Sequence, residues 1–135
     1  MNTSLFRWAF ALIFMSLIGA FFVPLAAIPR LAVSAHTIGM MSGLLLIAIG
    51  AIWTHFRLSD HQLLWLKWLW IYSSYANWIG CLIGGMLGAG RTTPVAAAGM
   101  EGGAAAEAAV LVLLGSVGVV AVFAAGLSWW GVRRG

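Results

Sequence analysis

Charged side chains are scarce in this sequence, and acidic ones are the scarcest. Only 7% of the 135 residues are charged, with three Asp or Glu against seven Lys or Arg. A soluble domain carries roughly 25% charged residues because its surface faces water. The sequence therefore argues against a soluble fold. Its net charge of +4, in a chain this apolar, indicates contact with anionic lipid headgroups and not with nucleic acid.

Cysteine and the common motifs of soluble enzymes are also lacking. The single cysteine, Cys81, has no partner for an internal disulfide and is interpreted as a small buried hydrophobe. No spacing of His, Cys, Asp and Glu resembles a zinc site. No glycine motif for nucleotides appears, and no Ser, His and Asp order suggests a hydrolase.

Long apolar runs are what the sequence has in abundance, since 63% of its residues are hydrophobic. Four runs reach about 20 residues or more, the length with which a helix crosses a hydrocarbon core of about 30 Å. The first run follows Arg7 and is interpreted as a retained helix rather than as a signal peptide. The prediction is an all-α integral membrane protein, a single four-transmembrane-helix bundle over residues 1–135, with helices at about 8–28, 33–56, 63–89 and 106–130.

The breaks between these runs are expected at proline, polar and small residues. Pro29 and Arg30 are expected to stop the first helix, because proline does not continue a helix. A polar turn at 57–62 separates the second helix from the third. Residues 90–105, which are rich in Gly and Ala, form the one substantial loop that the sequence predicts.

Positive charge is distributed unequally between the two expected sides of the membrane. Four crossings place the N-terminus, the second loop and the C-terminus on one side, with five Lys or Arg residues against two on the other. Because positively charged loops resist translocation, both termini are predicted to be cytoplasmic, in a multi-pass protein of the bacterial inner (cytoplasmic) membrane. Seven of the eight tryptophans fall near the same boundary, where indole rings prefer to lie. The first side carries Arg7, Arg57, Lys67, Arg133 and Arg134, and the other carries Arg30 and Arg91.

Polar side chains inside the expected helices are candidates for function, because polarity within a bilayer is expensive. His36 lies about one turn inside the second helix, and Gly39 and Gly43 share its face at offsets of three and seven. A histidine here is either a hydrogen-bonded structural residue or an axial ligand of haem iron. The glycines either allow close helix packing or leave a flat wall for a macrocycle. The other polar candidates are Ser42, Tyr72, Ser73, Ser74, Tyr75, Asn77 and Glu107.

The third expected helix carries Gly80, Gly84 and Gly88 at a four-residue spacing, which predicts helix packing or oligomerisation through a smooth stripe. His55 and His61 flank the polar turn before this helix and are interpreted as solvated residues at the membrane interface.

The depth of the candidates in the membrane is estimated by counting about 1.5 Å per residue from the helix ends. Ser42 reaches a depth comparable to that of Tyr75 and Asn77, whereas His36 is shallower. A ligand held by His36 is therefore expected to present its other face to these groups across a subunit boundary.

Two short motifs resemble those of a known family, the membrane isomerases that comprise hydroxylaminobenzene mutases and styrene oxide isomerases. They are Ala35-His36-x-x-Gly39-x-x-x-Gly43 and Tyr75-x-Asn77-Trp78-x-Gly80. Length and loops are closest to the mutase branch. The resemblance implies a homotrimer with ferric haem b at each subunit interface and a small aromatic substrate taken from the lipid bilayer. It also implies site residues: His36 as the iron ligand beside Gly39 and Gly43, and Tyr75 and Asn77 on the substrate side.

The activity that the resemblance implies is conversion of hydroxylaminobenzene to 2-aminophenol, a step in the degradation of aromatic compounds. Ferric iron acts in it as a Lewis acid, without net redox. Where the styrene oxide branch has an asparagine six residues after the ligand, this chain has Ser42, which favours the hydroxylamine over an epoxide.

Two other functions stay open at this point, an epoxide isomerase and a non-catalytic b-type haem or electron-transfer subunit. An electron carrier usually has two axial histidines, and only His36 is well placed. A transporter is disfavoured, because the two halves of the chain show no internal repeat.

Overall fold

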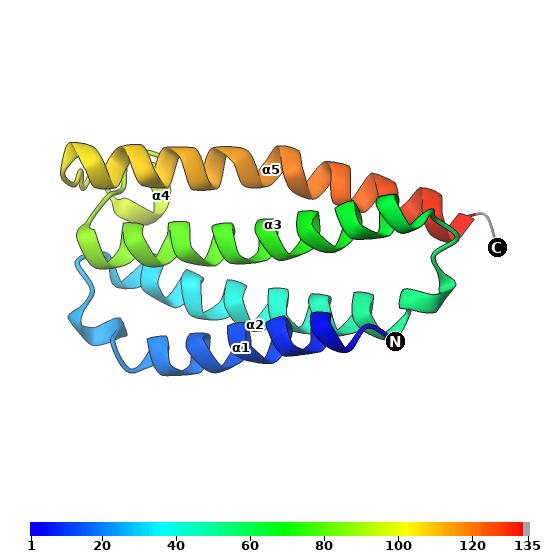
Figure 1. Ribbon diagram of the computed structural model, residues 1–135. Helices are drawn as coiled ribbons and strands as arrows, with labels where there is room; N and C mark the ends of the chain where they lie inside the picture. The colour runs from blue at the N-terminus through cyan, green and yellow to red at the C-terminus, as the bar shows by residue number, and fades with distance from the viewer. Residues whose placement is uncertain (134–135) are drawn as a thin grey trace.

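The computed structural model describes residues 1–133, and within them it contains helices and turns but no strand. Four long helices run side by side along the described part of the chain (Figure 1). The all-α prediction is confirmed for these residues. The helices are α1 (Thr3–Ala20), α2 (Pro29–Ala51), α3 (Asp60–Leu87), the short α4 (Pro94–Ala97) and α5 (Ala104–Arg133), with 3-10 turns at Val23–Leu25 and Trp53–His55.

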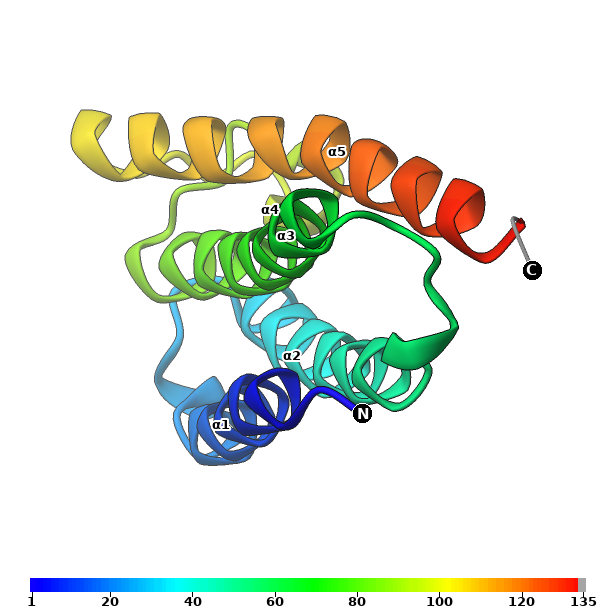
Figure 2. The same cartoon turned by 45° about the vertical axis from the view of Figure 1, so that its right-hand side comes forward.

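The long helices pack in the order of the sequence, so that α2 contacts α1 and α3, and α5 packs against α3 (Figure 2). The N-terminus, the turn between α2 and α3, and the end of α5 lie at one end of the molecule (Figure 1). Backbone hydrogen bonds join these segments, from Asn2 N to Gly50 O at 2.9 Å and from Arg57 N to Gly131 O at 3.1 Å. The helix contacts enclose the largest fully buried apolar side chains, which are Leu5, Leu12, Leu46, Leu66 and Val110.

Three helices are long and apolar enough to cross a membrane by length and composition, namely α1, α2 and the Ala104–Val132 part of α5. Helix α3 has 28 residues but is not one of them. Its first turns carry Asp60 and Lys67, and its middle carries Tyr, Ser and Asn side chains. The fold therefore shows a membrane protein with three candidate spans, and the fourth crossing stays a prediction.

The boundary between the first two helices differs from the expected one. Helix α1 ends at Ala20, and Pro29 does not stop it but is the first residue of α2. Proline suits the first helical position, because its missing N–H would have no partner there and its φ angle is already helical.

Side-chain caps explain why α1 and α3 begin before the residues expected from hydropathy. The Asn2 side-chain oxygen accepts the N–H of Leu5 at 3.2 Å, so α1 begins at Thr3. Ser59 and Gln62 form a capping box in which each side chain accepts the backbone N–H of the other. Such caps satisfy N–H groups that the helix itself leaves unpaired.

The loop between α3 and α5 contains α4 and is tied to α5 by a buried carboxylate. Glu107 is 6% exposed and accepts the backbone N–H of Arg91 at 3.1 Å and of Gly102 at 2.8 Å. The Arg91 guanidinium pairs with Glu101 at 2.9 Å, and the hydrogen bond to Glu101 raises the pKa of Arg91. Glu107 therefore holds the loop, and this contact explains its burial without any catalytic role.

Candidate functional site

His36 reaches from α2 to the backbone of α1. Its Nδ1 lies 2.8 Å from the carbonyl oxygen of Ser16. A carbonyl oxygen only accepts, so Nδ1 carries the proton, and in the neutral ring the lone pair is on Nε2. Histidines that ligate metals usually donate their other N–H in this way, which fixes the tautomer and the ring orientation. The partly buried imidazole of His36 is thus held with Nε2 as the nitrogen that is left to act as a ligand.

Gly39 and Gly43 are what allow α1 to approach His36 so closely. A Cβ added at Gly39 would overlap the Ser16 side chain and come within 2.8 Å of Trp78 Cδ1. A Cβ added at Gly43 would overlap Ile13 of α1. Within one chain these glycines serve helix packing, and because α1 covers them, a macrocycle bound to His36 has to lie to one side of them.

The glycines of α3 face different neighbours and do not form one continuous stripe. Gly80 lies against Leu114 of α5, Gly84 lies against Leu31 of α2, and Gly88 ends the helix with φ +71°. A four-residue step advances about 400° around a helix, so such a row drifts from one neighbour to the next.

The two candidate tyrosines of α3 point to different helices. The Tyr75 hydroxyl donates to the backbone oxygen of Trp8 on α1 at 2.7 Å. The Tyr72 hydroxyl lies 2.7 Å from Ser116 Oγ on α5, which itself donates to Leu113 O. Tyr75 is therefore the one that faces the helix that orients His36.

Asn77 and Ser42 are not brought together with the other candidates in one chain. Asn77 lies two residues after Tyr75, or about 200° around the helix, so the two side chains leave nearly opposite sides of α3. No residue in the described part of the chain hydrogen-bonds to the Asn77 side chain. Ser42 lies six residues after His36, which places it about 120° away around α2.

The antiparallel packing of α2 and α3 sets the depth of these residues. Gly39 lies against Trp78, and counting from this contact places Ser42 level with Tyr75. His36 is then six residues, roughly 9 Å, nearer the other end of the molecule. One chain therefore does not surround the imidazole of His36 with the substrate-side candidates.

The surface near His36 is apolar and open. Val33, three residues before His36 on α2, is 49% exposed. Of five surface cavities between about 220 and 520 Å³, none is lined by His36. Nowhere in residues 1–133 do three His, Cys, Asp or Glu side chains gather as a metal site.

Ser16 is the residue of this site that the sequence did not indicate. It contributes a backbone atom, and its hydroxyl is fully buried and donates to Leu12 O at 2.8 Å. A backbone acceptor leaves no signal in residue type, because every residue has a carbonyl group.

Fold and site together define a small helical membrane protein with one histidine held as a potential ligand. The chain belongs to the styrene oxide isomerase family, because the sequence model of that family matches residues 1–133. It is an isomerase of that family. It is 37% identical over 126 residues to hydroxylaminobenzene mutase HabA of Ectopseudomonas oleovorans, covering 93% of each chain. It is 33% identical over 130 residues to hydroxylaminobenzene mutase HabB of the same organism, covering 96% of this chain and 79% of the relative. No solved structure matches the chain.

Proposed function

We propose that this chain is a haem-dependent membrane isomerase that converts hydroxylaminobenzene to 2-aminophenol, with ferric iron as the Lewis acid. The observation that carries the proposal is the hydrogen bond from His36 Nδ1 to Ser16 O, because it leaves Nε2 as the ligand atom. The choice of substrate is supported by the two relatives that are named hydroxylaminobenzene mutases. This reaction belongs to the degradation of aromatic compounds.

The donor set of this chain fits haem b. His36 would hold the group through one nitrogen, which suits an iron that already has four nitrogen ligands in its macrocycle. Ferric haem, when bound, supplies a Lewis acid that polarises the oxygen of the substrate. The carbonyl of Ser16 keeps the His36 ring in position and raises its basicity toward iron.

Tyr75 and Asn77 are proposed to contact the substrate, and Ser42 lies level with Tyr75. Because the Tyr75 hydroxyl donates to Trp8 O, its lone pairs remain available to accept a hydrogen bond from the hydroxylamine. The Asn77 amide can both donate and accept. Since Tyr75 and Asn77 leave opposite sides of α3, they contact one substrate only if different subunits provide them.

A homotrimer with haem at each subunit interface completes this site. The support is that one chain leaves His36 beside an open apolar face of α2, away from its own Tyr75. A second subunit packed on that face would exclude water and lipid from the iron and bring its own polar groups to it. Native mass spectrometry that finds a stable monomer with full haem would contradict the trimer.

The membrane arrangement that we propose has four crossings with both termini in the cytoplasm. Helix α3 has 28 residues, or about 42 Å, and packs between α2 and α5 (Figure 1). Arg7, Arg57 and Lys67 lie toward the end of the molecule where the termini meet, whereas Arg134 is outside the described residues. A reporter active only in the periplasm, fused to the C-terminus, should be silent, and an active one would overturn this topology.

An epoxide isomerase is the second candidate, and the description of the family favours it. An electron-transfer subunit is less compatible with the structure. His55 lies 19 residues after His36, at the other end of α2, and His61 Nε2 accepts the indole N–H of Trp65 at 2.9 Å. Neither histidine is near enough to share an iron with His36 in one chain.

The deciding experiment is an anaerobic assay of purified protein with hydroxylaminobenzene and, in parallel, styrene oxide, without added cofactor. We expect a Soret band in the absorption spectrum and formation of 2-aminophenol. Faster turnover of styrene oxide would favour the epoxide reaction. A strict requirement for NAD(P)H, or full activity in haem-free protein, would contradict the proposed mechanism.

A further inference from the structure

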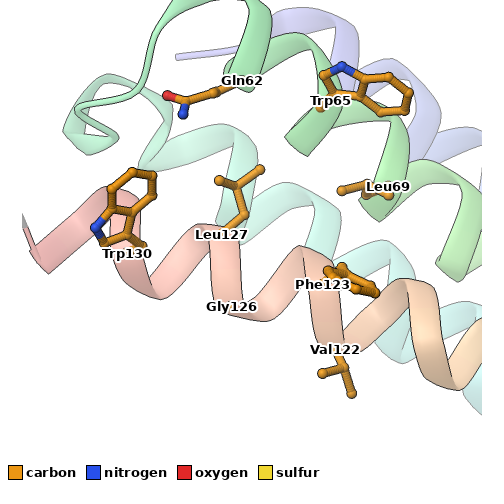
Figure 3. A pocket seen from close by; sticks show the side chains of 8 residues that line it. All are labelled: Gln62, Trp65, Leu69, Val122, Phe123, Gly126, Leu127 and Trp130. Carbon is orange, nitrogen blue, oxygen red and sulfur yellow. The ribbon is translucent and has the colours of Figure 1, made fainter.

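A groove runs between α3 and α5 toward the end of the molecule where the chain termini lie (Figure 3). Its volume is about 490 Å³. A Cβ added at Gly126 would meet nothing within 4 Å, so this glycine leaves part of the groove unfilled. Three of the lining residues come from α3 and five from α5: Gln62, Trp65 and Leu69, and Val122, Phe123, Gly126, Leu127 and Trp130.

Gln62 brings an amide to an otherwise apolar and indole lining. Its Oε1 accepts the backbone N–H of Ser59 at 3.0 Å, which fixes the orientation of the amide. The amide nitrogen is therefore left to point toward α5 and the groove (Figure 3). The groove thus has a hydrogen-bond donor at one end and an apolar channel beyond it.

The same end of the groove carries positive charge. Arg57 N donates to Gly131 O at 3.1 Å, so the Arg57 backbone lies next to the residue that follows Trp130. Its exposed side chain forms no salt bridge with the described residues, among which Arg91 pairs with Glu101 in the loop before α5. Asp60 is the one acidic residue at this end of the described chain.

We infer that this groove is a binding site for an anionic phospholipid. One acyl chain lies between α3 and α5 along Leu69 and Phe123. The phosphate lies at the mouth, where the Gln62 amide and the Arg57 guanidinium donate hydrogen bonds to it. Trp65 and Trp130 flank the mouth at the depth that indole rings prefer, near the headgroups.

Charge, and not the acyl chain, makes this site selective. A lipid tail gains little by moving from the bilayer into an apolar groove, because both surroundings are equally apolar. The homotrimer proposed above uses the open face of α2, so a second copy of the chain is not assigned to this groove. An anionic headgroup complements the mouth, whereas a zwitterionic one brings no net charge.

Native mass spectrometry of the full chain in detergent tests this inference, with phosphatidylglycerol and phosphatidylcholine added in equal amounts. We expect wild type to retain mainly phosphatidylglycerol. Arg57→Gln should lower the ratio of the two bound lipids about fivefold, which is the effect of one cation at a membrane surface. Arg30→Gln removes the same charge at the opposite end and should leave the ratio unchanged.

Two variants of α5 test whether the lipid lies in the groove itself. Gly126→Leu fills the groove and should reduce retention of both lipids, whereas Gly118→Leu should retain them. Both glycines are open to added atoms, and only Gly126 lines the groove. Circular dichroism checks that each variant folds. If Gly126→Leu does not fold, the comparison of wild type with Arg57→Gln still decides the inference. Equal binding of the two lipids by wild type, an unchanged ratio in Arg57→Gln, or a changed subunit number in Gly126→Leu would overturn the inference.

Discussion

Helices α1 and α2 meet through several glycines, whereas α3 and α5 meet at Gly80 and are also joined by hydrogen bonds between large polar and aromatic side chains. Gly39, Gly43 and Gly50 all lie against side chains of α1. Across the other pair, Trp70 Nε1 donates to Ser128 Oγ at 2.9 Å, and the Tyr72 hydroxyl bonds to Ser116 at 2.7 Å. The first pair is close enough for an imidazole to reach a backbone oxygen, and the second leaves open grooves.

This difference separates two kinds of site. Where α1 and α2 lie close together, the Ser16 carbonyl oxygen holds His36 in one tautomer. This oxygen belongs to the backbone, so a side-chain substitution does not remove it. Beside the contact of α3 and α5 lies a groove of about 490 Å³, and individual hydrogen bonds join the two helices. The predicted catalytic ligand belongs to the first kind, and the predicted lipid site to the second.

Removing the His36 imidazole, which lies between α1 and α2, should have the largest effect, a loss of haem binding. We expect His36→Ala to weaken haem binding by more than about 100-fold, beyond the range for losing only the hydrogen-bond partner of a ligand. The Soret absorbance per protein measures the loss. His55→Ala and His61→Ala are the controls and should keep the band, and equal haem in His36→Ala and wild type would refute the assignment.

Tyr75 links the two halves of the molecule, because its hydroxyl joins α3 to the backbone of α1. We expect Tyr75→Phe to lower kcat by roughly 10- to 1,000-fold, the range for losing one preorganised hydrogen-bonding group. The Soret band should stay nearly unchanged. Tyr72→Phe is the matched control, since that hydroxyl faces α5, and an equal loss of kcat in both variants would argue against a substrate role for Tyr75.

Gly39→Ala tests whether closeness of α1 and α2 is what orients the histidine. The added Cβ overlaps Ser16, so we expect a loss of stability of about 1–3 kcal/mol and a 10- to 100-fold weaker haem affinity. Gly118→Ala, at a position with nothing within 4 Å, should change neither. The measurements are haem titration and thermal unfolding, and a normal haem affinity in Gly39→Ala would show that the His36 orientation does not depend on this contact.

The smallest effects are expected between α3 and α5. Trp70→Phe and Tyr72→Phe each remove one interhelical hydrogen bond, and such bonds in membrane proteins average about 0.6 kcal/mol. Trp70 and Tyr72 are two residues apart on α3 but bond to different serines of α5, so the double variant measures whether the two losses add. Unfolding in denaturing detergent measures them. A loss several times larger would mean that this pair, too, is held by close packing.

Local patterns predicted much of the fold. Apolar runs place the helices near their observed positions, and the boundary errors at Asn2 and Pro29 arose because hydropathy does not register caps or the preference of proline for a first helical turn. Hydropathy predicts a membrane span least well for α3, because the polar residues of this helix lower its mean hydropathy. These residues lie on a helix that packs against α2 on one side and α5 on the other.

The sequence by itself determined the helical membrane class, the family, and His36 as the histidine within an apolar span. Only the tertiary structure decided that the Ser16 carbonyl oxygen accepts the Nδ1–H of His36. It also decided that the two glycines after His36 face α1, and that Tyr72 and Tyr75 point to different helices. The physical reason is that helix formation and membrane insertion depend on local composition, which is written in each segment. The rotation and register of one helix against another depend instead on many weak contacts between distant segments, and these contacts exist only after the helices have packed.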